Sequence, residues 1–282
     1  MDKIFSDSYS FSGRLVSGPS AFRKLYALYG YFQGKNATEI LLNVDELEWM
    51  DANLCAVLDS IIFVLNRDFG HQFFIDKKHV EGKFEIFERN GFIQSSHSAG
   101  RMRIDNRDTS IKMTRFKTES DLEFVEYIGE SLLGHKAFEE MPEIKVELLD
   151  HFLEVFTNIQ LHARTNGPIF ACGQFYPIQN ILKFTLVDIG IGFLQPISDF
   201  TKGKIVSINQ AILWALEEKH TTKLDAPGGM GLTFLKKYCE ENGHGFQIVT
   251  DGICWTNEKS FLNFWEVEKF PGTTINLTFN CK

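Results

Sequence analysis

Residues 143–163 read EIKVELLDHFLEVFTNIQLHA, and their apolar side chains recur at the spacing of an amphipathic helix. Within this stretch Glu154, Asn158 and His162 follow one another at intervals of four residues. Because four residues of a helix turn through about 400°, the three side chains share one face and form a polar stripe between apolar flanks. A polar stripe is usually a solvated surface, so this helix alone predicts no function.

Two predicted strands follow the helix, GPIFACGQFYP at 167–177 and NILKFTLV at 180–187. The second strand runs into DIGIG, in which Asp188 stands at the strand end. Gly190 and Gly192 permit a tight backbone turn after it. On its own this pattern is common and identifies no ligand.

A second glycine-rich stretch, PGGMGL at 227–232, opens a predicted helix that ends near residue 242. Glycines at a helix start, here Gly229 and Gly231, bring unpaired N–H groups and the positive end of the helix dipole close to an anion such as phosphate. A flexible loop before an ordinary helix is the alternative. PGTT then leads into a terminal strand, INLTFNC at 275–281.

The order and spacing of these elements carry more information than any one of them. Asn158, Asp188, Gly229 and Gly272 are separated by 30, 41 and 43 residues. In this arrangement residues 119–282 resemble the ATPase domain of the gyrase, histidine kinase and MutL (GHKL) superfamily. The resemblance implies an α/β sandwich of the histidine-kinase-like type, with an N-box helix, an Asp-containing glycine box and a second glycine box after a lid.

The resemblance implies ATP and Mg²⁺ as cofactors and gives roles to the polar residues. Asn158 would hold Mg²⁺ between the phosphates, a hard-cation task suited to an amide oxygen. Glu154, one turn earlier, would act as general base in a catalytic member. His162 takes the position of a basic or polar residue on the phosphate side. Asp188 would accept the adenine amino hydrogen and so select adenine over guanine.

Small residues take the other implied roles. Gly190 and Gly192 would leave room for the base and sugar. Gly229 and Gly231 would give backbone N–H groups to the phosphates. Thr273 lies where relatives help the aspartate and an ordered water grip the base.

The 35 residues 193–227 between the two glycine boxes correspond to the ATP lid of the family. We expect one helical run in it, at 208–218. The lid region also contains polar side chains that could close on a triphosphate or stay solvated: Lys202, Lys204, Lys219, Thr221, Thr222 and Lys223.

The first part of the chain alternates predicted helices and strands, which indicates a parallel sheet with packed helices. The expected elements are a helix from Pro19 to about residue 32, a strand at 39–44, a helix at 52–66 with Asp51 as N-cap, a strand at 71–76 and a helix near 80–90.

Roughly residues 8–95 resemble the STAS domain of anti-sigma-factor antagonists, in which a strand leads to an Asp-Ser turn that caps a helix. Those antagonists are switched by phosphorylation of the serine after the capping Asp. Here Ala52, Asn53 and Leu54 follow Asp51, so no hydroxyl is available. We expect a docking or regulatory unit, with a stabilising appendage as the alternative.

Charge places the boundary between the two parts. Residues 1–116 carry 15 basic and 15 acidic side chains and residues 117–282 carry 14 and 22, so the net charge of −8 belongs to the second part. The polar stretch before it predicts a solvated connector. The expected division is therefore a STAS-like domain at 1–95, a linker at 96–118 and an ATPase domain at 119–282.

Composition restricts the compartment and the partners. An excess of acidic over basic side chains, 37 against 29, argues against nucleic acid. We find neither a signal peptide nor an apolar run of the roughly 20 residues that span a bilayer, and therefore expect a cytoplasmic protein without a membrane partner. The five cysteines are scattered, which suggests buried thiols and not a disulfide framework or zinc site.

Three functions remain open. We favour an ATP-binding intracellular signalling regulator, in which MgATP binding or slow hydrolysis controls contacts with a regulatory protein partner through the STAS-like domain. An anti-sigma-type protein serine/threonine kinase acting on a separate STAS protein is the alternative. A sensor histidine kinase is disfavoured, because too few residues precede the N-box helix and His135, their only candidate phosphoacceptor, is expected in an exposed loop. Relatives often dimerise, so the resemblance also allows a homodimer.

Overall fold

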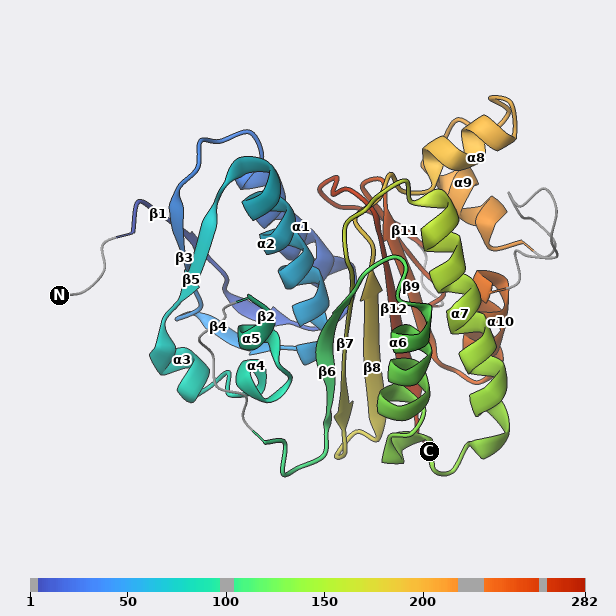
Figure 1. The fold of residues 1–282 in the computed structure, drawn as a ribbon, viewed down its shortest axis with the longest axis horizontal. Helices are drawn as coiled ribbons and strands as arrows, with labels where there is room; N and C mark the ends of the chain where they lie inside the picture. Colours follow the sequence, from blue (N-terminus) through green and yellow to red (C-terminus); the bar gives the residue numbers. More distant parts are fainter. Residues whose placement is uncertain (1–4, 97–103, 218–230, 259–262, 282) are drawn as a thin grey trace.

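A computed structural model describes residues 5–96, 104–217, 231–258 and 263–281 as a mixed α/β structure. Across Figure 1 a small sheet, the helices α1 and α2, a large sheet and the helices α6, α7 and α10 follow one another as layers. The N-terminal elements are β1 (Asp7–Ser10), β2 (Gly13–Leu15), α1 (Pro19–Phe32), β3 (Glu39–Asn43), β4 (Leu47–Met50), η1 (Ala52–Leu54), α2 (Cys55–Phe69), β5 (Gln72–Ile75), α3 (Lys77–Glu81), α4 (Ile86–Arg89) and α5 (Phe92–Ser96).

The small sheet is parallel, as the alternation of helices and strands predicts. Its strand order is β1-β3-β5, and β2 and β4 form a separate parallel pair. α1 has the predicted bounds. The helix expected near residues 80–90 is instead two short helices, α3 and α4.

The large sheet has seven strands in the order β11-β10-β9-β12-β8-β7-β6, and each neighbouring pair is antiparallel. The C-terminal elements are β6 (Ser110–Phe116), α6 (Asp121–Glu126), η2 (Tyr127–Leu132), η3 (Lys136–Phe138), η4 (Pro142–Ile144), α7 (Lys145–His162), β7 (Ile169–Tyr176), β8 (Ile181–Val187), α8 (Leu194–Phe200), α9 (Ile208–Ala215), α10 (Gly231–Glu241), β9 (Gly245–Thr250), β10 (Ile253–Thr256), β11 (Phe264–Glu266) and β12 (Thr273–Asn280).

The large sheet is buried on both faces. Side chains alternate between the faces of a strand, so Val187 of β8 belongs to the core shared with α1 and α2, whereas Leu186 belongs to the core under α7. Phe152 and Phe156 of α7 are almost fully buried in that second core. The N-terminal elements thus form one continuous core with the C-terminal sheet.

The expectation of a solvated connector over residues 96–118 is wrong for residues 110–116. These residues form β6, which pairs with β7 at the edge of the large sheet. Ile111 and Met113 are buried on it, while Arg115 makes a two-pronged bond of 2.7 Å per contact to the fully buried Asp59 of α2. The charged residues of this segment obscured its strand pattern in the sequence. One of these residues, Arg115, joins the large sheet to helix α2.

Asp51 precedes the helical segment as predicted, but its carboxylate does not cap the helix. It accepts hydrogen bonds from the backbone N–H of Ser17 at 2.7 Å and from Nε1 of Trp49 at 2.8 Å. Its Oδ2 also lies 2.6 Å from Nζ of Lys183 on β8. Asp51 therefore fastens the N-terminal turn to the large sheet.

His135 is not an exposed loop histidine, which corrects that expectation. Its side chain is buried, and its Nδ1 accepts a hydrogen bond from the N–H of Ala137 at 3.1 Å. Its Nε2 lies 3.1 Å from the carbonyl oxygen of Asp108. Burial lowers the pKa of this imidazole. His135 is thus a structural residue at the start of η3.

Candidate functional site

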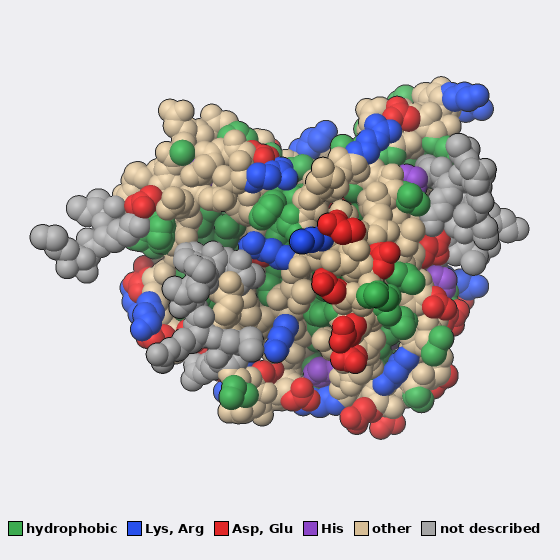
Figure 2. Space-filling view, viewed as in Figure 1, with side chains coloured by type: hydrophobic (Ala, Val, Ile, Leu, Met, Phe, Trp, Pro, Cys, Tyr) green, Lys and Arg blue, Asp and Glu red, His purple; other side chains and the backbone are tan. Residues whose placement is uncertain are grey.

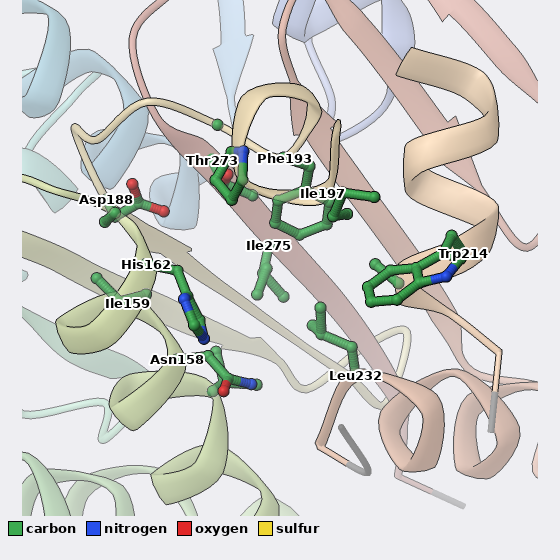
Figure 3. A pocket seen from close by; sticks show the side chains of 15 residues that line it. Asn158, Ile159, His162, Asp188, Phe193, Ile197, Trp214, Leu232, Thr273 and Ile275 are labelled. Carbon is green, nitrogen blue, oxygen red and sulfur yellow. The ribbon is translucent and has the colours of Figure 1, made fainter. Parts of the chain in front are cut away.

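A cavity of about 120 Å³ opens between the C-terminal half of α7, one end of the large sheet, and helices α8, α9 and α10 (Figure 3). Its lining is Val155, Asn158, Ile159, His162, Ala163, Asp188, Gly192, Phe193, Pro196, Ile197, Trp214, Ala215, Leu232, Thr273 and Ile275. Five of the residues proposed from sequence, Asn158, His162, Asp188, Gly192 and Thr273, meet at this cavity although they come from three separate stretches of the chain.

The three residues of the polar stripe on α7 differ in their position relative to the cavity. Asn158 and His162 line it, whereas Glu154, one turn earlier, lies outside the lining. The side chain of Glu154 is 17% exposed, and its Oε2 is 3.8 Å from Nδ1 of His151. His151 in turn stacks on Phe234 of α10, with ring centroids 3.8 Å apart. Glu154 is therefore held at the contact between α7 and α10.

Asp188 is a buried acid at the end of β8, and its side chain lies beside the cavity (Figure 3). Burial raises its pKa to about 6, although hydrogen bonds from the N–H of Gly190 and from Thr273 lower it. The bond from Gly190 reaches Oδ1 at 2.8 Å. A carboxylate in this position can accept a hydrogen bond from a ligand and discriminates between donors and acceptors on it.

The two glycines after Asp188 are required by close packing. A Cβ at Gly190 would overlap the carbonyl oxygen of Ala163, at the end of α7. A Cβ at Gly192 would overlap the carboxylate of Asp251, and Gly192 also has a φ of 76°. Gly192 lines the cavity, and Gly190 instead brings the end of β8 against the helix.

The start of β12 completes this end of the cavity. The carbonyl oxygen of Thr273 accepts a hydrogen bond from the backbone N–H of Asp188 at 2.9 Å. The hydroxyl of Thr273 donates a hydrogen bond to the hydroxyl of Thr250 at 3.2 Å. Gly272, just before it, has a φ of 97° and leaves no space for a Cβ, which would overlap the carbonyl oxygen of Asp188. The two strand ends therefore lie in direct backbone contact.

The second glycine box is described only from Gly231 onward. Gly231 begins α10, and a Cβ there would lie 3.1 Å from the carbonyl oxygen of His151 and 3.2 Å from Cβ of Glu154. The absence of a side chain at Gly231 thus lets α10 approach α7 closely beside Glu154. Gly229 and the lid residues Lys219, Thr221, Thr222 and Lys223 lie outside the described residues.

The other proposed lid lysines lie away from the cavity wall. Lys202 and Lys204 are exposed in the connection between α8 and α9, and neither lines the cavity. The helical run expected at 208–218 is α9, which the structure assigns to Ile208–Ala215.

Sequence reasoning missed three further residues at this site. Phe193, just before α8, and Trp214, on α9, supply aromatic surface to the cavity (Figure 3). Asp251, in the turn between β9 and β10, bonds the loop that carries Phe193. The tight TDG turn is visible in the sequence, but its contact with residues nearly 60 positions earlier is not.

The acidity of the second part of the chain lies mainly on its surface. Figure 2 shows acidic side chains gathered over α6 and the neighbouring helical segment. Asp121, Glu123, Glu126 and Glu130 are exposed there. Among the residues that line the cavity, Asp188 is the acidic one. The net charge therefore does not oppose an anionic ligand in the cavity itself.

Comparisons with known proteins give no assignment: no family model, no curated protein and no solved structure matches this chain. Among the described residues, no helix combines the length and the apolar character needed to cross a membrane.

Proposed function

We propose that this protein is a signalling regulator that binds MgATP in the cavity between α7 and the large sheet, and that binding or slow hydrolysis alters its contacts with a protein partner. The observation that carries the proposal is the convergence of Asn158, His162, Asp188, Gly192 and Thr273 on one cavity. The motif order and the family resemblance predict all five residues from the sequence, and unrelated surface residues would not be expected to meet in this way.

The cavity wall suits a purine. Asp188 offers an acceptor for an exocyclic amino group, which adenine has at the position where guanine has a carbonyl. Ile159, Ile197 and Ile275 supply apolar surface for the base, and Phe193 adds an aromatic ring. Ligand sites of this kind combine mainly apolar walls with a few oriented polar groups.

The oxygen ligand that the cavity offers also fits a magnesium ion that is held mainly by phosphates. Mg²⁺ is commonly bound by one or two protein oxygens together with phosphate oxygens and water, and Asn158 offers one amide oxygen at the cavity. When bound, the ion would neutralise phosphate charge. Gly231, at the start of α10, lies on the same side of α7 as Glu154, so helix N–H groups would meet the phosphates there.

Glu154 is the residue on which turnover would depend. Its partial burial and its contact with His151 fix the carboxylate beside the start of α10. A carboxylate held there can take a proton from an attacking water, which gives hydrolysis, or from a partner hydroxyl, which gives the kinase alternative. Binding alone would suffice for a regulator.

The N-terminal unit is the proposed output of the nucleotide site. The hydroxyl of Tyr26, on α1, bonds the hydroxyl of Thr274 at 2.5 Å, next to Thr273 at the cavity. Asn53 reaches Thr185 and Asn276 in the same sheet, each at 2.8 Å. A STAS-like unit attached to the strands of the site could pass a change at the nucleotide to a partner.

Calorimetry with MgATP tests the proposal. Wild-type protein should bind MgATP and not MgGTP, Asp188→Asn should bind at least tenfold more weakly, and Asp199→Asn, an exposed carboxylate outside the cavity lining, should bind as wild type. Absence of binding to wild type would refute it. The kinase alternative is favoured if label from γ-labelled ATP moves to a partner protein and this transfer disappears in Glu154→Ala. The ATP-operated regulator is favoured if phosphate is released to water instead.

A further inference from the structure

We propose that Asp251 is a positioning residue for the nucleotide site, which fixes the loop Gly192–Phe193–Leu194 at the adenine end of the cavity. The inference rests on the proposed function and extends it to a residue outside the cavity lining. Asp251 belongs to the tight turn between β9 and β10, far in sequence from the glycine box that it contacts.

The contact is made to the backbone of the loop. Oδ2 of Asp251 accepts hydrogen bonds from the N–H of Phe193 at 2.9 Å and from the N–H of Leu194 at 3.0 Å. These are the first N–H groups of α8, which have no partner within their own helix. A negative charge at a helix start is also favoured by the helix dipole. One carboxylate oxygen thus fixes two consecutive residues of the cavity wall.

The fit of Asp251 against Gly192 is close enough to explain that glycine. A Cβ at Gly192 would overlap the Asp251 carboxylate, so the loop can approach its anchor only without a side chain. The Asp251 side chain is 9% exposed, which limits competition from water for the two bonds. Lys269 lies 3.7 Å from Oδ1 but is 75% exposed, so its contribution is small.

Asp251 also acts on the ionisation of Asp188. Its negative charge raises the pKa of Asp188, in addition to the larger effect of burial. The other groups around Asp188 include the N–H groups of Gly190 and Thr273, the hydroxyl of Thr273, the buried hydroxyl of Tyr26 on α1, and the His162 side chain that lines the same cavity. Removal of the charge at residue 251 should therefore make Asp188 easier to ionise.

The experiment compares Asp251→Ala and Asp251→Asn with wild type by hydrogen exchange of the Phe193 and Leu194 amides without nucleotide and by MgATP titration between about pH 5 and pH 8. Alanine should accelerate exchange at both amides and weaken MgATP binding about tenfold. Asparagine keeps an oxygen acceptor, so binding near pH 8 should stay within about threefold of wild type. In Asp251→Asn the loss of MgATP affinity with falling pH should begin at a lower pH than in wild type.

Asp105→Ala is the matched control, because Asp105 accepts comparable bonds from the N–H groups of Thr109 at 2.9 Å and Ser110 at 2.7 Å, outside the cavity lining. It should leave MgATP affinity unchanged. Equal losses in Asp105→Ala and Asp251→Ala would overturn the inference, as would unchanged exchange and affinity in Asp251→Ala. If alanine prevents folding, Asp251→Asn decides: unchanged exchange at both amides together with an unmoved pH midpoint overturns the inference. Failure of wild type to bind MgATP would instead refute the proposed function.

Discussion

Asp51 and Lys183 form a buried ion pair that joins the turn before α2 to the middle of the large sheet. Oδ2 and Nζ are 2.6 Å apart, and the two side chains are 3% and 10% exposed. The same carboxylate receives bonds from Ser17, Trp49 and the hydroxyl of Tyr176. The three residues after Asp51, Ala52, Asn53 and Leu54, are fully buried.

Lys183→Met should destabilise the protein by about 3–5 kcal/mol, because it leaves the Asp51 carboxylate buried without its cation. Denaturant unfolding measures the loss. The double variant Lys183→Met with Asp51→Leu should recover part of it, since both charges are then absent. A loss below about 1 kcal/mol in the single variant would show that water or other donors replace the lysine.

The affinity for MgATP should decrease as the pH falls through about 6, because the ionised Asp188 carboxylate accepts the adenine amino hydrogen more strongly than the protonated acid does, and its pKa is about 6. Titrations across this range should show that dependence in wild type. In Asp188→Asn the residual binding should lose it. A flat profile in wild type would separate Asp188 from recognition of the base.

The raised pKa of Asp188 also predicts how this residue affects the free energy of unfolding in the absence of nucleotide. Its pKa is raised from the ordinary 3.8, so the folded state binds the proton more tightly than the unfolded state. The stabilising contribution is fully present below about pH 4 and is lost as the pH rises through about 6, for a total of roughly 3 kcal/mol. Above that range Asp188→Asn should therefore be more stable than wild type in denaturant unfolding. Lower stability of the variant at pH 8 would contradict this.

Part of this site could be predicted from the sequence. The interval of four residues placed Asn158 and His162 on one face of α7, and both reach the cavity. Asp188 was predictable as a strand-end residue because glycines follow it, whereas Thr273 was expected at the site only from the family resemblance. These signals are local, so they are visible in one chain without an alignment.

The parts that the sequence did not predict depend on contacts between distant residues. Asp51 has the local pattern of an N-cap, and its partner Lys183 is 132 positions away. β6 was hidden because Arg115, which suggested a solvated connector, bonds the buried Asp59. Asp251 belongs to an ordinary turn, and only the folded chain brings it to α8.

Tyr26→Phe should test whether the N-terminal unit supports the nucleotide site. The variant removes the hydroxyl that bonds Thr274 at 2.5 Å and leaves the buried threonine without that partner, at a cost of about 1–2 kcal/mol in unfolding free energy. MgATP affinity should also fall, since Thr273 is the next residue. Tyr31→Phe, at a tyrosine that is 49% exposed, is the control and should change neither quantity. A Tyr26→Phe protein that loses stability but binds MgATP as wild type would show that the unit does not influence the site.

Gly272→Ala should abolish MgATP binding and strongly destabilise the protein, for two separable reasons. Gly272 has a φ of 97°, and a Cβ there would overlap the carbonyl oxygen of Asp188, so the ends of β8 and β12 would be forced apart. Gly203→Ala isolates the first reason: its φ is 76°, but nothing lies within 4 Å of its Cβ position. That control should lose only about 1–2 kcal/mol and keep its affinity. Thermal unfolding and calorimetry on the pair measure the difference, which is the part due to the close approach of the two strands. Equal behaviour of the two variants would mean that backbone conformation alone explains Gly272, and that the contact between Asp188 and the start of β12 tolerates displacement.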